Sequence, residues 1–281
     1  MNDLARQART MLQRLTGRTG AIIPVVKLQG VIAADQRPGR LNIASVGPLL
    51  KRAFAIKSAP AIAIVINSPG GSPVQSRLIS KRIRDLADEH NKPVLVFVED
   101  AAASGGYFIA VAGDEIIVDP SSIIGSIGVI MAGFGFVGAL EKLGVERRVH
   151  TAGNNKSTLD PFLPEKSSDI ERIKQFELDI HQVFIDHVKA GRAGKLKAPD
   201  ETLFTGEWWT GMRSVELGLA DAIGDLHETL RTRYGKDVRL KLIEPKKSFF
   251  SLPRLGFSAS GITADFTATV EDRAAWARLG R

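Results

Sequence analysis

Residues 61–73 read AIAIVINSPGGSP, and this stretch decides the fold. Its first six residues are apolar and mostly β-branched, which is typical of a strand buried on both faces of a parallel sheet. The Ser-Pro-Gly-Gly-Ser-Pro that follows is a strong turn signal. Because helices have to cover both faces of such a strand, the stretch predicts an α/β protein.

Strand-like and helix-like segments alternate on both sides of this stretch. Buried-strand patterns recur at 22–28, 93–99 and 115–119, and apolar residues at helical spacing occupy 42–56 and 74–90. Helices between successive strands imply right-handed crossovers, so we expect a largely parallel sheet with helices on both faces.

The second half of the chain is expected to be richer in helix. We expect short strands within 125–131 and 145–151, a long amphipathic helix over 167–190, a helix ending near Gly218, a helix over 226–234, a last strand over 237–244, a loosely docked linker over 248–263 and a short helix over 268–279.

Two glycine-rich turns, at 68–72 and 104–106, directly follow predicted strands. The carboxyl ends of parallel strands meet at one edge of the sheet, and ligands bind beyond that edge. We therefore expect both turns to lie at one site.

The composition excludes several classes of function. The chain has no cysteine, so disulfides and thiolate chemistry are excluded. Its net charge is +7, but the basic residues are scattered among acids without an aromatic-lined basic stripe, so we expect no nucleic-acid partner. No cluster has metal-ligand spacing and no nucleotide fingerprint occurs, so we expect neither a metal nor a cofactor.

Three parts of the chain are expected: a basic amphipathic helix over 1–20, a main domain over 21–247 and a tail over 248–281. The first could lie on an anionic membrane through residues 1–18, pack on a neighbouring subunit, or be a frayed polar helix. No apolar run is long enough for a membrane helix and no signal peptide is apparent, so we expect a cytoplasmic or peripheral protein.

Ser104 is the candidate nucleophile at the predicted edge. It stands in Ala-Ala-Ala-Ser-Gly-Gly between a strand and a predicted helix, where a serine hydroxyl can be exposed and the N–H of Gly105 could face an oxyanion. A helix-capping serine would have the same pattern. The glycine pair after Asn67 could likewise form an oxyanion hole or an ordinary turn.

The residues alone do not identify the general base. None of the five histidines lies in a glycine-rich or turn context, which argues against a histidine-based triad. Lys156 lies in a polar loop, where a lysine is usually an exposed surface residue, and it could act as a base only with a lowered pKa.

Four stretches, in consistent order, resemble the signal peptide peptidase A (SppA) family of Ser–Lys serine peptidases, in its short single-repeat form. They are INSPGGS (66–72), VEDAAASGGYFIAVAGDEIIVDPSSIIGSIGV (98–129), GNNKS with PF (153–162) and WTGMRSVELGLADAIG (209–224). The resemblance implies a Clp-protease/crotonase-like fold, a repeated β-β-α superhelix with a largely parallel sheet and a helical interface segment.

The resemblance also implies roles for single residues. Ser104 corresponds to the nucleophile, Lys156 to the general base, and Ser126 to a serine that hydrogen-bonds the lysine amine. The oxyanion hole and the substrate-binding positions correspond to the following residues: Gly71 and Gly105 for the oxyanion, and Gly70, Ser72, Gly125 and Gly128 for the substrate.

The function implied is hydrolysis of peptides, either signal-peptide remnants or small cytosolic peptides, through an acyl-enzyme. The family's architecture further implies a homo-oligomer in which Lys156 of one protomer serves Ser104 of another. Two other classes remain open: a crotonase-like acyl-CoA enzyme that uses the same glycine-rich turns, and a non-catalytic scaffold that keeps the fold.

Overall fold

The computed structural model describes residues 20–35, 37, 39–153, 155–245 and 273–280. The helix predicted for 1–20, its membrane contact through 1–18 and the linker predicted for 248–263 therefore lie outside the described residues, apart from Gly20.

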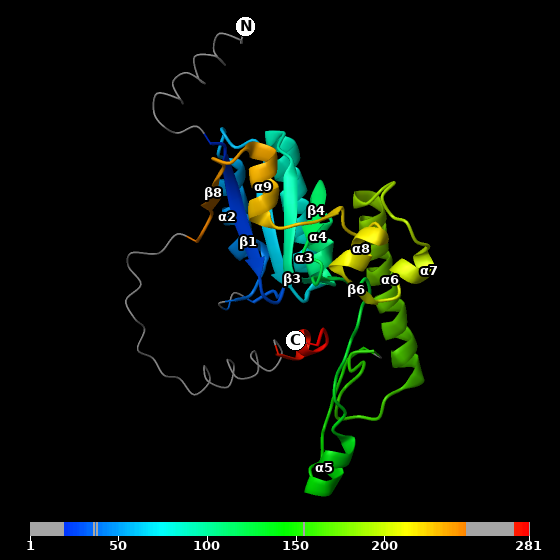
Figure 1. Cartoon of the computed structure of the whole chain (residues 1–281). Helices are drawn as coiled ribbons and strands as arrows, with labels where there is room; N and C mark the ends of the chain where they lie inside the picture. The colour runs from blue at the N-terminus through cyan, green and yellow to red at the C-terminus, as the bar shows by residue number, and fades with distance from the viewer. Residues whose placement is uncertain (1–19, 36, 38, 154, 246–272, 281) are drawn as a thin grey trace, which may run out of the picture.

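An eight-stranded sheet forms the centre of the molecule (Figure 1). Six strands follow the order β6-β5-β3-β2-β1-β8, and β4 and β7 branch from β3. Among the strands of the described residues, only β5 and β6 pair antiparallel, so the predicted α/β fold with a largely parallel sheet is confirmed. The strands are β1 (Ile22–Gln29), β2 (Ile62–Ser68), β3 (Val94–Ala103), β4 (Glu115–Val118), β5 (Ile123–Gly125), β6 (Trp208–Thr210), β7 (Ala222–Ile223) and β8 (Arg239–Leu242).

Helices cover both faces of the sheet. The larger core lies against α2, α3 and α4, and a smaller one lies under α9, where Leu230 is fully buried. The helices are α2 (Ile43–Phe54), α3 (Pro73–His90), α4 (Gly105–Ala110), α5 (Val137–Leu143), α6 (Ser167–Gly191), α7 (Asp200–Leu203), α8 (Gly211–Glu216) and α9 (Leu226–Tyr234). The predicted helices at 42–56, 74–90, 167–190 and 226–234 are confirmed, with ends that differ by up to two residues.

Local sequence fixes where the helices next to the sheet edge begin. Asn42 starts α2 with a capping box, since its side chain accepts from the Ser45 N–H while the Ser45 hydroxyl accepts from the Asn42 N–H. Pro73 occupies the first turn of α3, where its missing N–H costs no hydrogen bond. The residue after α3, Asn91, is its C-cap and adopts the left-handed conformation at φ 48°.

Strand β3 contains an irregularity that positions the candidate nucleophile. Its residue Val98 pairs with Ile66 of β2, whereas Ala102 pairs with Ser68, so four residues of β3 advance against two of β2. Before this bulge β3 pairs with β4, and after it with β5. The bulge therefore extends β3 past its neighbour and lets the strand end at the edge where Ser104 follows.

The short strands predicted at 125–131 and 145–151 are wrong. β5 ends at Gly125, and no strand occurs in the described residues between 126 and 166. This segment, with α5 at its far end, forms an arm that projects away from the sheet (Figure 1). Its β-branched residues suggested strands, but they meet no pairing partner in the described residues. The large apolar side chains exposed on the arm are Ile130, Met131, Phe134, Phe136, Leu143, Val145 and Val149.

Helix α6 runs from the arm back to the body of the molecule. Of its apolar residues, Phe184 and Val188 are buried in the core, whereas Phe176 is 52% exposed. Its amphipathic pattern is therefore only partly satisfied within one chain. No helix in the described part of the chain is both long and apolar enough to span a bilayer.

A buried ion pair joins the end of α6 to the sheet. Arg192 is 1% exposed; it donates to the Gly218 carbonyl and, at 2.6 Å, to Asp221. Burial raises the pKa of the Asp221 carboxyl, but hydrogen bonds from Arg192 and Lys195 outweigh burial and hold that pKa below its ordinary value. Asp221 is one residue of the 209–224 stretch, and this ion pair gives it a structural role.

The end of the chain docks on the sheet. The described residues 273–280 include a helical turn at 273–277, within the predicted helix 268–279. Leu279, which is 7% exposed, and Trp276 pack on Ala101, Ala103 and Ile123. This contact lies directly behind the ends of β3 and β5.

Candidate active site

Ser104 occupies a strained turn between β3 and α4. Its φ of 51° and ψ of −121° lie outside the regions that L-residues normally adopt. Its side chain makes no capping hydrogen bond to α4, and the residue is half-buried. The alternative that Ser104 is a helix cap therefore lacks its hydrogen bond, and the geometry is that of a serine presented at a sharp strand-to-helix turn.

The glycine pair lies against this turn. A Cβ built on Gly70 would be 2.7 Å from the Cβ of Ser104, so only glycine fits there without displacement. Gly70 and Gly71 have φ values of 104° and 138°, which also favour glycine. A Cβ on Gly105 would be 3.3 Å from the Gly71 nitrogen, so the two glycines are close neighbours.

Two backbone donors at this point have no acceptor. Within the described residues, neither the N–H of Gly71 nor that of Gly105 donates a hydrogen bond to the protein. By contrast, the N–H of Gly70 donates to the Ser68 hydroxyl at 3.2 Å. Both free donors belong to residues that line the same pocket as Ser104. They can therefore hold the negative charge that develops on a carbonyl oxygen under attack.

Ser126 lies on the segment beside Ser104. The N–H of Ser104 donates to the Gly125 carbonyl at 2.8 Å, which joins the two segments. Ser126 also has a left-handed backbone, at φ 53°, and its N–H donates to the Glu207 carbonyl at 2.7 Å. The structure thus brings Ser104, Gly125 and Ser126 together.

The two remaining predicted substrate-binding residues, Ser72 and Gly128, lie at different places. The Ser72 hydroxyl accepts from the Gln75 N–H at 3.4 Å, so Ser72 caps α3. Gly128 lines the pocket, and a Cβ at this position would be 3.0 Å from the Cα of Gly206. A side chain there would press the segment away from its neighbour.

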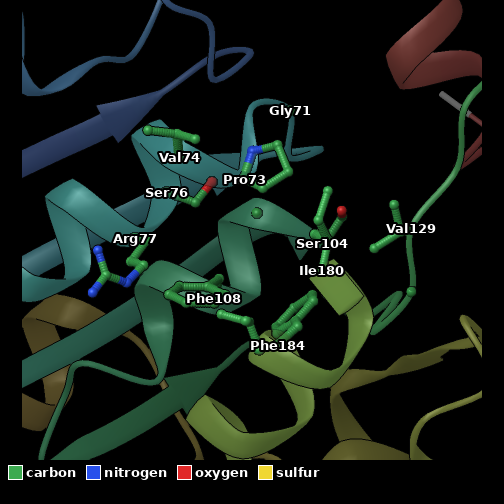
Figure 2. Close-up of a pocket in the computed structure, with 13 residues that line it drawn as sticks. Gly71, Pro73, Val74, Ser76, Arg77, Ser104, Phe108, Val129, Ile180 and Phe184 are labelled. Carbon is green, nitrogen blue, oxygen red and sulfur yellow. The ribbon is translucent and has the colours of Figure 1, made fainter. Parts of the chain in front are cut away.

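An apolar pocket of about 180 Å³ opens beside Ser104. Figure 2 shows Ser104 between the turn at Gly71 and helix α6, with Val129 on the other side. The floor includes Phe108 and Phe184, whose ring centroids are 5.2 Å apart. The described residues that line the pocket are Gly71, Pro73, Val74, Ser76, Arg77, Ser104, Gly105, Phe108, Gly128, Val129, Ile180, Val183 and Phe184.

His187 supports the floor of this pocket. Its ring stacks on Phe108 at 3.9 Å between centroids, and its Nε2 lies 2.9 Å from the Phe108 carbonyl and 3.2 Å from the Ser80 hydroxyl. Burial lowers the pKa of His187, with a smaller contribution from the charge of Arg77. His187 therefore packs beneath the pocket, where it contacts Phe108 and Ser80.

Lys156 does not join the site within one chain. It is exposed on the arm and is not among the described residues that line the Ser104 pocket. The one charged side chain in that lining is Arg77, whose guanidinium cannot act as a base because it stays protonated.

The pocket residues on α6 were not predicted as part of the site. Ile180, Val183 and Phe184 have the spacing of an amphipathic helix, which also fits a helix packed only on a core. Their place at the site depends on the return of the chain from the arm, which no local pattern encodes. Val129 was missed as a pocket wall for a similar reason, since its segment was predicted to be a strand.

Known structures support the fold. The 1510-N membrane-bound stomatin-specific protease aligns with a TM-score of 0.50 and 19% identity, over 81% of this chain and 99% of that one. A second structure of that protease, in complex with a substrate peptide, aligns with a TM-score of 0.50 and 20% identity. At this identity the likeness shows the fold, of the Clp-protease-like type, and not the activity.

Sequence relatives cover most of this chain but only a part of their own length. A Brucella abortus protein named Na(+)/H(+) antiporter NhaA is 55% identical over 272 residues, which are 92% of this chain and 37% of that protein. Serine protease SPPA, chloroplastic, of Arabidopsis thaliana is 31% identical over 75% of this chain and 32% of its own. Protease 4 of Haemophilus influenzae is 32% identical over 74% of this chain and 34% of its own.

The chain thus spans about a third of the length of these relatives, and the activity in a relative's name does not pass to it directly. The family assignment rests on a direct match. The sequence profile of peptidase family S49 matches residues 87–240, which is more than half of the 281 residues and includes Ser104, Ser126 and Lys156. The chain belongs to peptidase family S49.

Proposed function

We propose that the chain is a serine peptidase that cleaves peptide bonds through an acyl-enzyme on Ser104, with Lys156 of a second copy as general base. One observation carries the proposal: an uncapped, strained serine lies beside an apolar pocket and beside two backbone N–H groups that have no acceptor among the described residues. Nucleophile, oxyanion donors and a side-chain pocket are the parts that acyl transfer requires.

The proposed reaction uses these parts in turn. The neutral amine of Lys156 takes the hydroxyl proton of Ser104 while the oxygen attacks the carbonyl carbon of the peptide bond. The N–H groups of Gly71 and Gly105 hold the oxyanion. The lysine then returns the proton to the leaving amine, and water, deprotonated by the same lysine, releases the acyl group. The Ser126 hydroxyl bonds the amine and fixes its direction.

A second copy is the source of the base in this proposal. Among the described residues that line the pocket, no side chain can accept the Ser104 proton as a base, and Lys156 is exposed on the arm. The arm also exposes large apolar side chains, including Phe134, which is 83% exposed, and Leu143, which is 75% exposed. Apolar surface of this kind is typical of a protein interface, and a copy seated against it would bring Lys156 to a partner's Ser104.

The substrate class follows from the pocket and the neighbouring backbone. An apolar space of about 180 Å³ suits an apolar side chain of the residue before the cleaved bond. Within the described residues, the backbone N–H and carbonyl of Val129 make no hydrogen bond to the protein. An extended peptide can therefore pair with this segment as an added strand, with its side chain in the pocket.

The test uses fluorogenic peptides with apolar residues before the cleaved bond. Ser104→Ala, Lys156→Ala and an equimolar mixture of the two are compared with the native chain, and Lys142→Ala is the control because it removes another exposed lysine of the arm. Both variants should be inactive. The mixture should regain about a quarter of native activity, since random assembly across a heterologous interface leaves about one site in four intact.

Each outcome bears on a separate part of the proposal. Activity of Ser104→Ala would exclude this nucleophile, and full activity of Lys156→Ala would exclude this base. Two inactive variants with an inactive mixture would place the dyad within one chain.

A further inference from the structure

The backbone around Ser126 is held in a strained form by groups outside the proposed dyad. Ser126 has a φ of 53°, and a non-glycine residue keeps such a conformation only where the surroundings hold it. On its N-terminal side, the Ser126 N–H donates to the Glu207 carbonyl at 2.7 Å. This bond fixes the peptide group that precedes Ser126.

The peptide group between Ile127 and Gly128 is held from both ends. Its N–H, on Gly128, donates to the Ser126 carbonyl at 3.0 Å and closes a tight turn. Its carbonyl, on Ile127, lies 3.0 Å from the Nε2 of His181. Because a peptide group is planar, a bond that fixes its carbonyl also fixes the direction of its N–H. The hydrogen bond from His181 therefore also fixes the N–H of Gly128, which donates to the Ser126 carbonyl.

The Nε2 of His181 has to carry the hydrogen in this bond, because a carbonyl oxygen only accepts. The Ile127 side chain is fully buried. What His181 adds is the orientation of one peptide plane.

Helix α6 approaches the site at this point. Ile180, the residue before His181, lines the same pocket as Ser104 and Val129 (Figure 2). Four residues earlier along α6 than His181, Glu177 accepts from the Met131 N–H at 2.9 Å. The helix thus holds the segment 127–131 at two points, one near Ser126 and one beyond the pocket wall.

We propose that His181 is a positioning residue for Ser126, which rests on the proposed function of Ser126 as the group that orients the lysine amine. His181 does not contact the reacting atoms. It sets the peptide plane that holds the Ser126 backbone, and so the direction in which the Ser126 hydroxyl meets the base.

The experiment measures kcat on the fluorogenic peptide and the rate at which a fluorophosphonate labels Ser104, a single-turnover rate that stays measurable in slow variants. His181→Leu removes the donor, whereas His181→Gln restores an N–H close to the position of Nε2. Gln182→Leu, at the next and exposed position of α6, is the control for an added leucine. Each His181 variant is also made in a Ser126→Ala background.

We expect His181→Leu to lower both rates about five- to tenfold, the equivalent of one hydrogen bond. His181→Gln and Gln182→Leu should stay within about twofold of the native chain. In the Ser126→Ala background, His181→Leu should add less than about twofold, because its effect acts through a hydroxyl that is already absent. If His181→Leu does not fold, His181→Asn takes its place, since its shorter amide matches Nδ1 and leaves the Ile127 carbonyl unbonded.

Two results would overturn the proposal: native rates in His181→Leu, or the same loss with and without Ser126, which would mean a general effect on stability. A failure of the proposed function would give different experimental results. In that case Ser104→Ala remains active, or Ser126→Ala has native rates, whatever residue 181 is.

Discussion

The N–H of Ser104 donates to the carbonyl oxygen of Gly125 at 2.8 Å, so the proposed nucleophile and the segment that contains Ser126 are joined by one backbone hydrogen bond. This bond continues the pairing of β3 with β5 by one residue. The strained turns at Ser104 and Ser126 therefore cannot shift independently. Substitutions that displace either turn should lower catalytic activity before they lower the stability of the fold.

Gly70→Ala should lower activity at least about tenfold. The new Cβ would lie 2.7 Å from the Cβ of Ser104, and a φ of 104° would add strain of about 1–3 kcal/mol. Gly39→Ala is the matched control, because Gly39 also has a left-handed φ, of 83°, but has open space around its Cβ position. Steady-state kinetics and urea unfolding measure the two effects. Equal activities in the two variants would contradict the contact with Ser104.

Ile180→Trp should narrow the substrate range. The larger ring fills part of the pocket, so cleavage after large apolar residues should fall about tenfold or more, while cleavage after alanine should change little. Ile170→Trp, on the same helix and 37% exposed, is the control. The measurement is kcat/KM on a peptide series that differs only in the residue before the cleaved bond. A uniform loss across the series would argue against this pocket as the side-chain site.

Mild acid should loosen the pocket floor through His187. Burial lowers the pKa of His187 in the folded chain, so below its ordinary value of about 6.5 the unfolded chain binds a proton that the folded chain does not. The free energy of unfolding should therefore decrease as the pH falls through 6.5 towards the lower pKa of the folded chain.

Urea unfolding at pH 7.5 and pH 5.5 tests this expectation. His187→Gln can keep a donor to the Phe108 carbonyl but does not titrate, so its stability should depend less on pH than that of the native chain. His227→Gln, at an exposed position, should leave the native pH dependence in place. The same pH dependence in all three proteins would show that His187 titrates normally.

Leu279→Asp should release the end of the chain from the sheet. A carboxylate placed against Ala101 and Ala103 would lose its hydration without gaining a partner, a cost above about 2 kcal/mol. Limited proteolysis should then cut near residues 273–280 about tenfold faster or more. Ala277→Asp introduces the same charge at an exposed position and should be cut at the native rate. Unchanged protection in Leu279→Asp would mean that this contact does not hold the segment.

The parallel sheet could be predicted because its strands are buried on both faces. In residues 61–73, burial selects a run of apolar side chains and the turn selects glycine, so both signals are local. The arm could not be predicted in the same way. Val145 and Val149 have the β-branched character of a strand, but they are exposed and do not belong to the core of the described residues.

The residues of the site likewise form two groups, those with a local sequence signal and those without one. Ser104, Gly70 and Gly105 stand in turns whose unusual backbone is visible in the sequence as glycine and small residues. The pocket residues Ile180 and Phe184 come from a helix more than seventy residues further along, and their helical spacing is compatible with any apolar neighbour. His181 lies in the helix predicted over 167–190, but its contact could not be predicted, because its partner is a backbone carbonyl that has no sequence signature.

The position of Lys156 on an exposed arm has a consequence for the newly made chain. If a second copy supplies the base, as proposed, a single folded chain is latent, and its activity appears only above a threshold concentration set by self-association. Below that threshold, activity should rise more steeply than the amount of protein. A cell could then hold such a peptidase harmless simply by keeping it dilute, and could start proteolysis by gathering it in one place.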